Sequence, residues 1–255
     1  MFLLKNRLKE DLLNGKTCYG SFVTSPCPEV VEVLAIAGFD FAIIDTEHTV
    51  TGIETVVNMI RAAEAFGMTP IVRVPDDTLK NISRYQDVGA YGVQIPMVHT
   101  AEQASAIVRA MKYIPEGNRG MSGGRGTAWG KIADYRRVSN DEILVSVMCE
   151  TKTAVDNIEE IVRVPGVDIV FVGAYDLSQS YGVPGEVTHP VVEQGIQKVL
   201  RACLEAGVVP GIIAQDINLA KRRAREGFRY ITILDDMAFF MNCVEERLNA
   251  VKYGD

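Results

Sequence analysis

The sequence lacks any apolar run that could cross a membrane, and its first residues lack the pattern of a secretory signal. A membrane-spanning helix needs roughly 20 apolar residues, and a signal peptide needs basic, apolar and small-residue segments in that order. Basic residues are also outnumbered, since 26 lysines and arginines against 33 aspartates and glutamates leave a net charge of −7. Faces that bind nucleic acid are basic. We therefore expect a cytoplasmic protein that binds neither a membrane nor nucleic acid.

Closely spaced cysteines are also missing. The five cysteines are scattered, form no C-x-x-C motif and are odd in number, which is typical of reduced thiols in a cytosolic protein. Histidine and cysteine do not occur at the spacing that zinc sites use. Lysine is missing near the predicted strand ends except for Lys152, so the sequence favours metal-assisted chemistry over a Schiff base.

No linker or low-complexity segment divides the chain, so residues 1–255 are interpreted as one domain. Short apolar runs rich in β-branched residues alternate with segments of helical period. The predicted strands cover residues 17–23, 39–45, 70–74, 92–98, 143–149, 168–172, 209–214 and 230–234. The predicted helices cover residues 3–13, 28–37, 52–66, 76–87, 101–112, 154–162, 190–206, 217–226 and 238–253, with an irregular segment over 113–134.

This alternation predicts a TIM (β/α)8 barrel with an additional N-terminal helix. Near-continuous apolar strands are typical of a parallel sheet that is buried on both faces, and eight βα units in about 250 residues match a TIM barrel in number and length. A doubly wound open sheet is the alternative, but no G-x-G-x-x-G follows the first strand.

Charged residues gather where the predicted strands end, which is where barrel enzymes carry their active sites. The strand at residues 39–45 runs into Asp45-Thr46-Glu47-His48, which is either a catalytic cluster or an ordinary solvated loop. The other polar strand ends are Arg73, Glu150, Asp176, Gln215-Asp216 and Asp235-Asp236.

Glu150 and Asp176 follow adjacent strands, so their carboxylates can converge. Two carboxylates without neighbouring cysteine or histidine suit a hard divalent cation, Mg²⁺ or Mn²⁺. The alternative is that each carboxylate caps the helix that follows it. Arg73 stands inside an apolar strand, where it needs a partner. It either forms a buried ion pair with Glu47 or Asp45 or stabilises negative charge on a substrate, and the two roles are compatible.

These segments resemble the HpcH/HpaI aldolase family, the metal-dependent class II pyruvate aldolases, over residues 16–251. The segments that carry the resemblance are Phe41 to His48, Pro70 to Arg73, Asp87 to Gly89, Pro96 to Val98, Tyr113 to Pro115, Arg119-Gly120, Glu150-Thr151, Val167 to Gly173 and Asp176 to Ser178. The resemblance implies a lyase that reversibly splits a 4-hydroxy-2-oxo acid into pyruvate and an aldehyde.

The resemblance also implies roles for individual residues. Glu150 and Asp176 bind Mg²⁺ or Mn²⁺, with Co²⁺ as a further possibility, and pyruvate or its enolate chelates that metal. Arg73 contacts the keto oxygen of pyruvate. His48, oriented by Asp45, handles the proton of the aldol hydroxyl.

Further implications concern the surroundings of the site and the assembly. Glu47 supports metal-bound water, and the backbone amides of Gly173-Ala174-Tyr175-Asp176 hold the carboxylate of pyruvate. Asp87 approaches the site of a neighbouring subunit in a homohexamer. The last predicted helix carries an apolar stripe, formed by Phe240, Val244, Leu248 and Val251. This stripe fits either a helix that swaps between subunits or one that packs on the core of its own chain.

Two residues depart from the family pattern. Met148 stands where relatives carry glutamine and should face the same side of its strand as Glu150, with Cys149 on the other side. Tyr175 places a large ring near the expected aldehyde pocket. We interpret both as changes in the aldehyde that is accepted. A decarboxylase of oxaloacetate or a related oxo acid, and a barrel that only binds a metabolite, are the alternative functions.

Overall fold

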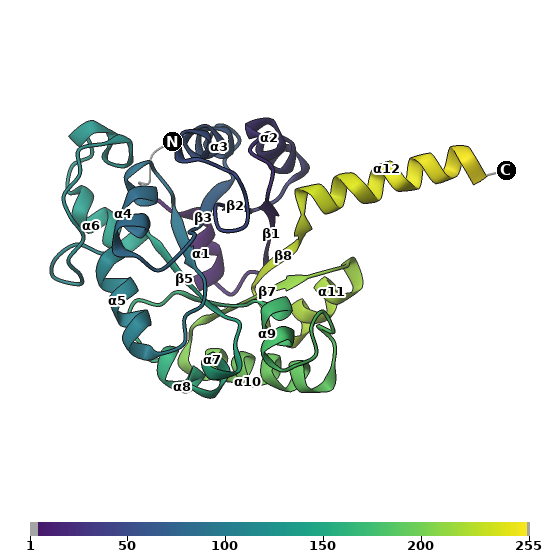
Figure 1. The fold of residues 1–255 in the computed structure, drawn as a ribbon. Coiled ribbons are helices and arrows are strands. Elements are labelled where there is room, and N and C mark those ends of the chain that lie inside the picture. Colours follow the sequence, from purple (N-terminus) through teal and green to yellow (C-terminus); the bar gives the residue numbers. More distant parts are fainter. Residues whose placement is uncertain (1–4, 254–255) are drawn as a thin grey trace.

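Eight strands close into one parallel barrel in the computed structural model, which describes residues 5–253 (Figure 1). The strands pair in chain order, and β1 closes the barrel against β8. Their bounds are β1 Cys18–Val23, β2 Phe41–Asp45, β3 Thr69–Arg73, β4 Gly92–Ile95, β5 Leu144–Cys149, β6 Ile169–Val172, β7 Val209–Ala214 and β8 Tyr230–Asp235. This arrangement confirms the predicted TIM barrel.

Helices follow the strands around the outside of the barrel (Figure 1). Their bounds are α1 Arg7–Leu13, α2 Pro28–Ala37, α3 Ile53–Ala65, α4 Leu79–Asp87, α5 Ala101–Met111, α6 Tyr135–Glu142, α7 Lys152–Asp156, α8 Ile158–Ile161, α9 Ala174–Ser180, α10 Pro190–Ala206, α11 Ile217–Glu226 and α12 Asp236–Tyr253, with a 3₁₀ helix η1 at Arg125–Gly130. Residues 3 and 4 of the helix predicted over 3–13 lie outside the described residues, and α1 begins at Arg7. None of the helices in residues 5–253 combines the length and apolarity that a membrane span requires.

Several predicted boundaries were wrong. The irregular segment contains η1, and α6 and α9 were not predicted at all. The helix predicted over 154–162 is divided into α7 and α8, and β4 ends at Ile95 rather than at residue 98. The helix predicted from residue 76 begins at Leu79, because Asp76 accepts a hydrogen bond from the N–H of Thr78 at 2.8 Å and forms a turn before the helix.

The interior of the barrel is filled by side chains, with large rings near its centre. The rings of Phe41 and Tyr230 stack with centroids 4.1 Å apart. They fit because Gly20 faces them without a side chain, since a Cβ atom at Gly20 would come within 2.3 Å of the Phe41 ring. The interior is therefore a packed core and not a channel.

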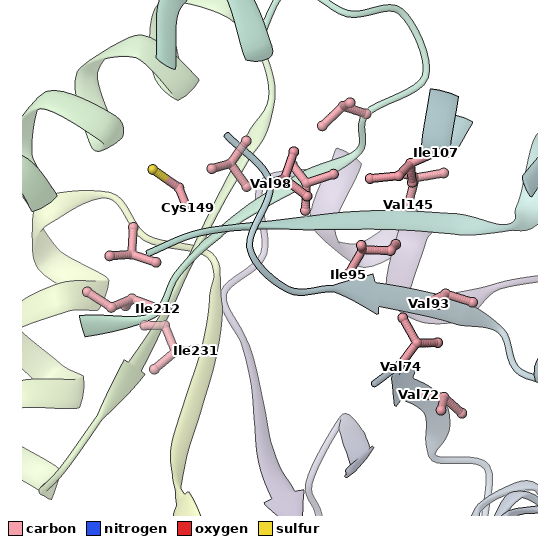
Figure 2. Close-up of a cluster of buried hydrophobic side chains, with 14 of the residues drawn as sticks. Val72, Val74, Val93, Ile95, Val98, Ile107, Val145, Cys149, Ile212 and Ile231 are labelled. Carbon is pink, nitrogen blue, oxygen red and sulfur yellow. The ribbon is translucent and has the colours of Figure 1, made fainter. Parts of the chain in front are cut away.

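A second core lies between the outer face of the barrel and the helices, and Figure 2 shows part of it. Cys149 belongs to this outer core, whereas Met148 belongs to the interior cluster. The alternation predicted for Met148 and Cys149 is confirmed. Residues labelled in Figure 2 include Val72, Val93, Val145, Ile212 and Ile231, which come from five different strands.

Helix α1 closes one end of the barrel. Leu8 and Leu12 join the interior cluster, and Lys9 Nζ lies 3.0 Å from Asp168 Oδ1 at the start of β6. The amide of Asn6 donates to the carbonyl oxygen of Tyr91 at 2.9 Å. Because this end is plugged, access to the barrel is from the opposite end, where the strands finish.

Helix α12 projects away from the barrel and packs on it only where it begins (Figure 1). The predicted apolar stripe is exposed along its length, with exposed fractions of 63% for Phe240, 42% for Val244, 48% for Leu248 and 84% for Val251. Within one chain, the stripe therefore does not pack on its own core.

Candidate active site

A cavity of about 250 Å³ opens at the carboxyl ends of the strands. It is lined by side chains from seven segments that follow or end different strands, as expected at the mouth of a TIM barrel. The lining residues are Phe22, Thr24, His48, Arg73, Met148, Phe171, Gly173, Ala174, Tyr175, Asp176, Ile213 and Asp235.

Glu150 follows β5 and is buried beside this cavity, with 3% of its surface exposed. Its Oε1 accepts a hydrogen bond from the backbone N–H of Met97 at 2.7 Å. Met97 has a left-handed φ of 55°, which ends β4 early and turns this N–H toward the carboxylate. A Cβ atom on Gly173 would lie 2.5 Å from Glu150 Oε2, so only glycine leaves room for the carboxylate there.

The pKa of Glu150 is raised to about 7, chiefly by burial and also by the negative charges of Asp176 and Glu47. The Met97 hydrogen bond and the charge of Arg73 oppose this rise only in part. Asp176 lies in the first turn of α9, at the edge of the cavity. The two carboxylates are thus close enough to repel each other, and a cation bound between them would relieve that repulsion.

Arg73 ends β3 and is clamped by two carboxylates. Its Nε and Nη2 donate to the two oxygens of Asp45 at 2.8 and 2.9 Å, and Nη1 lies 3.3 Å from Glu47 Oε2. Asp45 is fully buried, and the register pairs it directly with Arg73 across β2 and β3. A guanidinium carries five N–H groups, so two remain that can contact a substrate. The ion pairs predicted for Arg73 are confirmed.

The predicted hydrogen bond from Asp45 to His48 was wrong. Among the described residues, the side chain of Asp45 bonds Arg73 and the backbone N–H of Glu47, and does not reach His48. The chain does leave β geometry after Asp45, as expected, and Thr49 Oγ1 donates to the Asp45 carbonyl at 2.6 Å. His48 lies instead with Nε2 3.7 Å from Glu47 Oε2, and its side chain is 65% exposed.

Glu47 therefore connects Arg73 to His48. Burial raises the pKa of Glu47, the charges of Arg73 and His48 lower it, and those of Asp45 and Asp176 raise it again. Asp45 is the predicted neighbour of His48, whereas Glu47 lies beside its ring in the structure.

Other predicted residues divide between the cavity and the rest of the molecule. Met148 and Tyr175 line the cavity, and the Tyr175 side chain is 52% exposed at its mouth. Asp87 lies in a separate surface pocket and binds Arg119 Nη2 at 2.8 Å, so it is not part of the site of its own barrel. Lys152 is exposed and pairs with Asp156, which raises the pKa of its amine and disfavours Schiff-base chemistry.

The sequence does not distinguish Asp235 from Asp236, and it does not single out the lining residues Thr24, Phe22 and Ile213. Asp235 lines the cavity, whereas Asp236 turns away and binds Thr24 and Ser25. The missed residues carry weak signals, because hydroxyl and apolar side chains near strand ends are common.

One further group of possible metal ligands lies far from the cavity. Asp11, Cys18 and Asp40 approach one another near the start of β1 and β2. Lys16 Nζ lies 2.9 Å from Asp11 and 3.2 Å from Asp40, and burial raises the pKa of the Cys18 thiol to about 12. A lysine ammonium and a protonated thiol leave this group poorly suited to a cation.

Comparisons with known proteins agree with this fold. Residues 19–242 match the model of the family described as HpcH/HpaI aldolase/citrate lyase. The hydroxypyruvate/pyruvate aldolase of Chromohalobacter salexigens is 37% identical over 94% of this chain and 95% of its own. The 2-keto-3-deoxy-L-rhamnonate aldolase of Klebsiella pneumoniae is 32% identical over 98% of this chain and 94% of its own. A crystal structure of an HpcH/HpaI aldolase/citrate lyase family protein from Burkholderia cenocepacia superimposes with a TM-score of 0.94 at 34% identity, over 97% of this chain and 100% of that one.

Proposed function

The chain belongs to the HpcH/HpaI aldolase/citrate lyase family, and we propose that its barrel-mouth cavity performs a divalent-metal-dependent aldol reaction, splitting a 4-hydroxy-2-oxo acid into pyruvate and an aldehyde. The observation that carries this proposal is the carboxylate of Glu150, which is buried against the lining residue Gly173 and has its pKa raised to about 7 near Asp176 and Arg73.

The residues present fit a divalent cation. Glu150 and Asp176 offer oxygen ligands, and each negative charge is unfavourable for the other. Glu47 and Asp45 add further negative charge, which Arg73 balances only in part. Two carboxylates suit a divalent cation such as Mg²⁺, Mn²⁺ or Co²⁺, because such a cation can be held by few protein ligands and keep its other coordination positions for water and substrate.

Pyruvate is the product that we propose for this chain, because one relative is named a hydroxypyruvate/pyruvate aldolase and another a 2-keto-3-deoxy-L-rhamnonate aldolase. The first helical hydrogen bond of α9 is from Leu177 N–H to the Gly173 carbonyl at 2.9 Å. The N–H groups of residues 174–176 precede it and have no partner inside the helix. We propose that they hold the carboxylate of pyruvate, as the family resemblance implies.

In the cleavage direction, the 4-hydroxyl loses its proton, the bond between C3 and C4 breaks, and its electron pair becomes the pyruvate enolate, which then takes a proton at C3. A divalent cation at Glu150 and Asp176 would supply electrophilic stabilisation of the negative charge. The free N–H groups of Arg73, fixed by Asp45, face the keto oxygen on which that charge develops. His48 accepts the hydroxyl proton directly or through water, and Glu47 stabilises the resulting imidazolium.

The direct test combines pyruvate with a panel of aldehydes and Mg²⁺, Mn²⁺ or Co²⁺. We expect pyruvate to be consumed only when an aldehyde and a metal are both present, and a chelator to stop the reaction. Carbon dioxide release from oxaloacetate, with no aldol product from any aldehyde, would instead identify a decarboxylase. The absence of both reactions would favour a barrel that only binds a metabolite.

Metal affinity is expected to rise about tenfold between pH 6 and pH 8. Because the pKa of Glu150 is about 7 in the metal-free protein, a proton competes with the cation below pH 7 and not above it. Titration calorimetry with Mn²⁺ at both pH values, in buffers of different ionisation enthalpy, measures the affinity and the released proton. Equal affinity at pH 6 and pH 8 would show that Glu150 is not a ligand or not raised in pKa.

We further propose that the chain assembles as a homo-oligomer through α12, with the hexamer that the family resemblance implies as the expected form. The exposed stripe of α12 and an apolar groove between α2 and the start of α12 support this. Residues Val30, Val33 and Leu34 of α2 line that groove with Phe239 and Phe240. A stripe of this kind is stabilised when another copy covers it.

Replacing both Val244 and Leu248 by Glu is expected to lower the molecular mass in solution by at least half, because two charges would have to be buried in the interface. Analytical ultracentrifugation measures the mass. Asn249→Glu, at an exposed polar position of the same helix, is the matched control and should keep the wild-type mass. An unchanged mass for the double variant would exclude this stripe as the interface.

A further inference from the structure

Strand β8 carries one extra residue opposite β1, just below the cavity. The register pairs Gly20 with Thr232 and then Phe22 with Asp235, so two steps along β1 correspond to three along β8. Leu234, within this bulge, has a left-handed φ of 52°. Simple alternation from Tyr230 and Thr232 would turn Leu234 inward, and a bulge re-aims the side chain that follows it.

The bulge brings Asp235, and not Leu234, into the cavity. Asp235 is paired with Phe22, which is itself a lining residue, and both face the same space. A left-handed conformation at leucine is uncommon and costs free energy. The chain therefore keeps an unfavourable backbone conformation that has the effect of placing a carboxylate at the mouth of the barrel.

The adjacent Asp236 holds this arrangement in place. Its Oδ1 accepts hydrogen bonds at 2.7 Å from both the N–H and the hydroxyl of Thr24, and its Oδ2 accepts from the N–H of Ser25 at 3.1 Å and from the Ser25 hydroxyl. Asp236 thus fixes the loop after β1 to the end of β8. This anchor leaves the neighbouring Asp235 and Thr24 facing the cavity together.

Asp235 also has a structural contact that has to be separated from any role in binding. Its Oδ1 accepts a hydrogen bond from the N–H of Ala238 at 2.9 Å, in the first turn of α12. Among the residues that the structure describes, Oδ2 has no hydrogen-bond partner. One oxygen therefore caps the helix, and the other is available to a ligand in the cavity.

The two ends of the cavity differ in chemistry. Glu150 follows β5, Asp176 lies in α9 after β6, and Arg73 ends β3, and the proposed metal and pyruvate bind on this side. Asp235 and Thr24 extend from β8 and β1, which close the barrel on the other side. Under the proposed function the metal and pyruvate fill the first side, so we place the aldehyde on this second side.

We propose that Asp235 determines the class of aldehyde that reacts, by accepting a hydrogen bond from a hydroxyl group next to the aldehyde carbon and by repelling aldehydes that carry a carboxylate. A carboxylate accepts hydrogen bonds from hydroxyl groups more strongly than a neutral acceptor does, and like charges held close together discriminate strongly against a ligand. This inference rests on the proposed function and names the acceptor, an uncharged hydroxyaldehyde.

The test measures kcat/KM for glycolaldehyde, propionaldehyde and succinic semialdehyde at saturating pyruvate and Mn²⁺. Propionaldehyde matches glycolaldehyde in size but lacks its hydroxyl, and succinic semialdehyde carries a carboxylate. The wild-type protein is expected to prefer glycolaldehyde to each of the others by about tenfold or more. Asp235→Asn and Asp235→Ser are each expected to shift the ratio of glycolaldehyde to succinic semialdehyde about tenfold toward the anion, chiefly through KM.

Both substitutions keep an oxygen that can cap α12, so a role in capping alone would not change the ratio. Asp216→Asn is the matched control, since Asp216 caps α11 through the N–H of Leu219 at 2.8 Å after β7 and does not line the cavity. It should leave the ratio unchanged.

Two results would overturn this inference without affecting the proposed function. One is a wild-type protein that uses succinic semialdehyde as well as glycolaldehyde, and the other is an unchanged ratio in both Asp235 variants. Exchange of the methyl protons of pyruvate with D₂O in the same wild-type samples reports on the proposed function separately. Without exchange or condensation, the proposed function and this inference both fail. With exchange but an unchanged aldehyde ratio, only this inference fails.

Discussion

Replacing Glu150 by Gln is expected to lower metal-dependent aldol activity by at least about 10³-fold while the fold is kept. The variant keeps the size of the side chain and an oxygen for the Met97 N–H, but loses the negative charge that a divalent cation requires. Steady-state rates of pyruvate formation at saturating Mn²⁺ measure the loss. Glu205→Gln, at an exposed position, is the matched control and should keep wild-type rates.

The same variant is expected to be more stable than the metal-free wild type at pH 8. The pKa of Glu150 is raised from 4.5 to about 7 in the folded protein, so the folded state binds this proton more tightly than the unfolded state does. Stability is therefore lost as the pH rises through this range. At about 1.4 kcal/mol per pKa unit, the loss relieved by glutamine is about 3 kcal/mol at most. Urea unfolding measures it, and a less stable variant would contradict the assignment of an unfavourable buried charge.

Replacing Arg73 by Met is expected to lower kcat by about 10³-fold and to destabilise the protein by about 3 kcal/mol or more. The substitution removes the N–H groups that we propose contact the keto oxygen, and such groups are worth several kcal/mol in comparable sites. It also removes the guanidinium that donates to both carboxylate oxygens of Asp45, and leaves that fully buried charge without a cationic partner. Rates and urea unfolding measure the two effects separately.

The double variant Asp45→Asn with Arg73→Met separates catalysis from stability. Removing the unpaired charge should recover most of the lost stability, because a neutral amide is less costly to bury than a lone carboxylate. Activity should stay as low as in Arg73→Met. Recovery of activity together with stability would show that Arg73 acts only by holding the barrel mouth together.

The course of the barrel strands was predictable because it depends on local pattern. Continuous apolar runs separated by helical segments defined all of the strands, and strict alternation placed Met148 with Glu150 and Cys149 on the opposite face. Helix α6 was missed because its sequence, from Tyr135 to Glu142, is mostly polar and buries only Ser139 and Asn140. It has no apolar stripe that periodicity could detect.

The partners within the site were less predictable, since they depend on contacts between strands. The sequence predicts an ion pair of Arg73 with Glu47 or Asp45, but the register of β2 and β3 is what sets Arg73 directly against Asp45, and a sequence does not state that register. The family resemblance implied that Asp45 orients His48, whereas the turn after β2 brings His48 to Glu47. The different orientations of Asp235 and Asp236 likewise depend on a bulge between β8 and β1 that residue types do not reveal.

The most direct test of the account is the exchange of the methyl protons of pyruvate for deuterium in D₂O, followed by NMR in the absence of any aldehyde. This exchange reports formation of the enolate at the site of Glu150, Asp176 and Arg73, whatever aldehyde the protein accepts. We predict exchange with Mg²⁺ or Mn²⁺, its loss on chelation, and its absence in Glu150→Gln at every metal concentration. Exchange that persists both with a chelator and in Glu150→Gln would contradict the proposed metal-dependent mechanism.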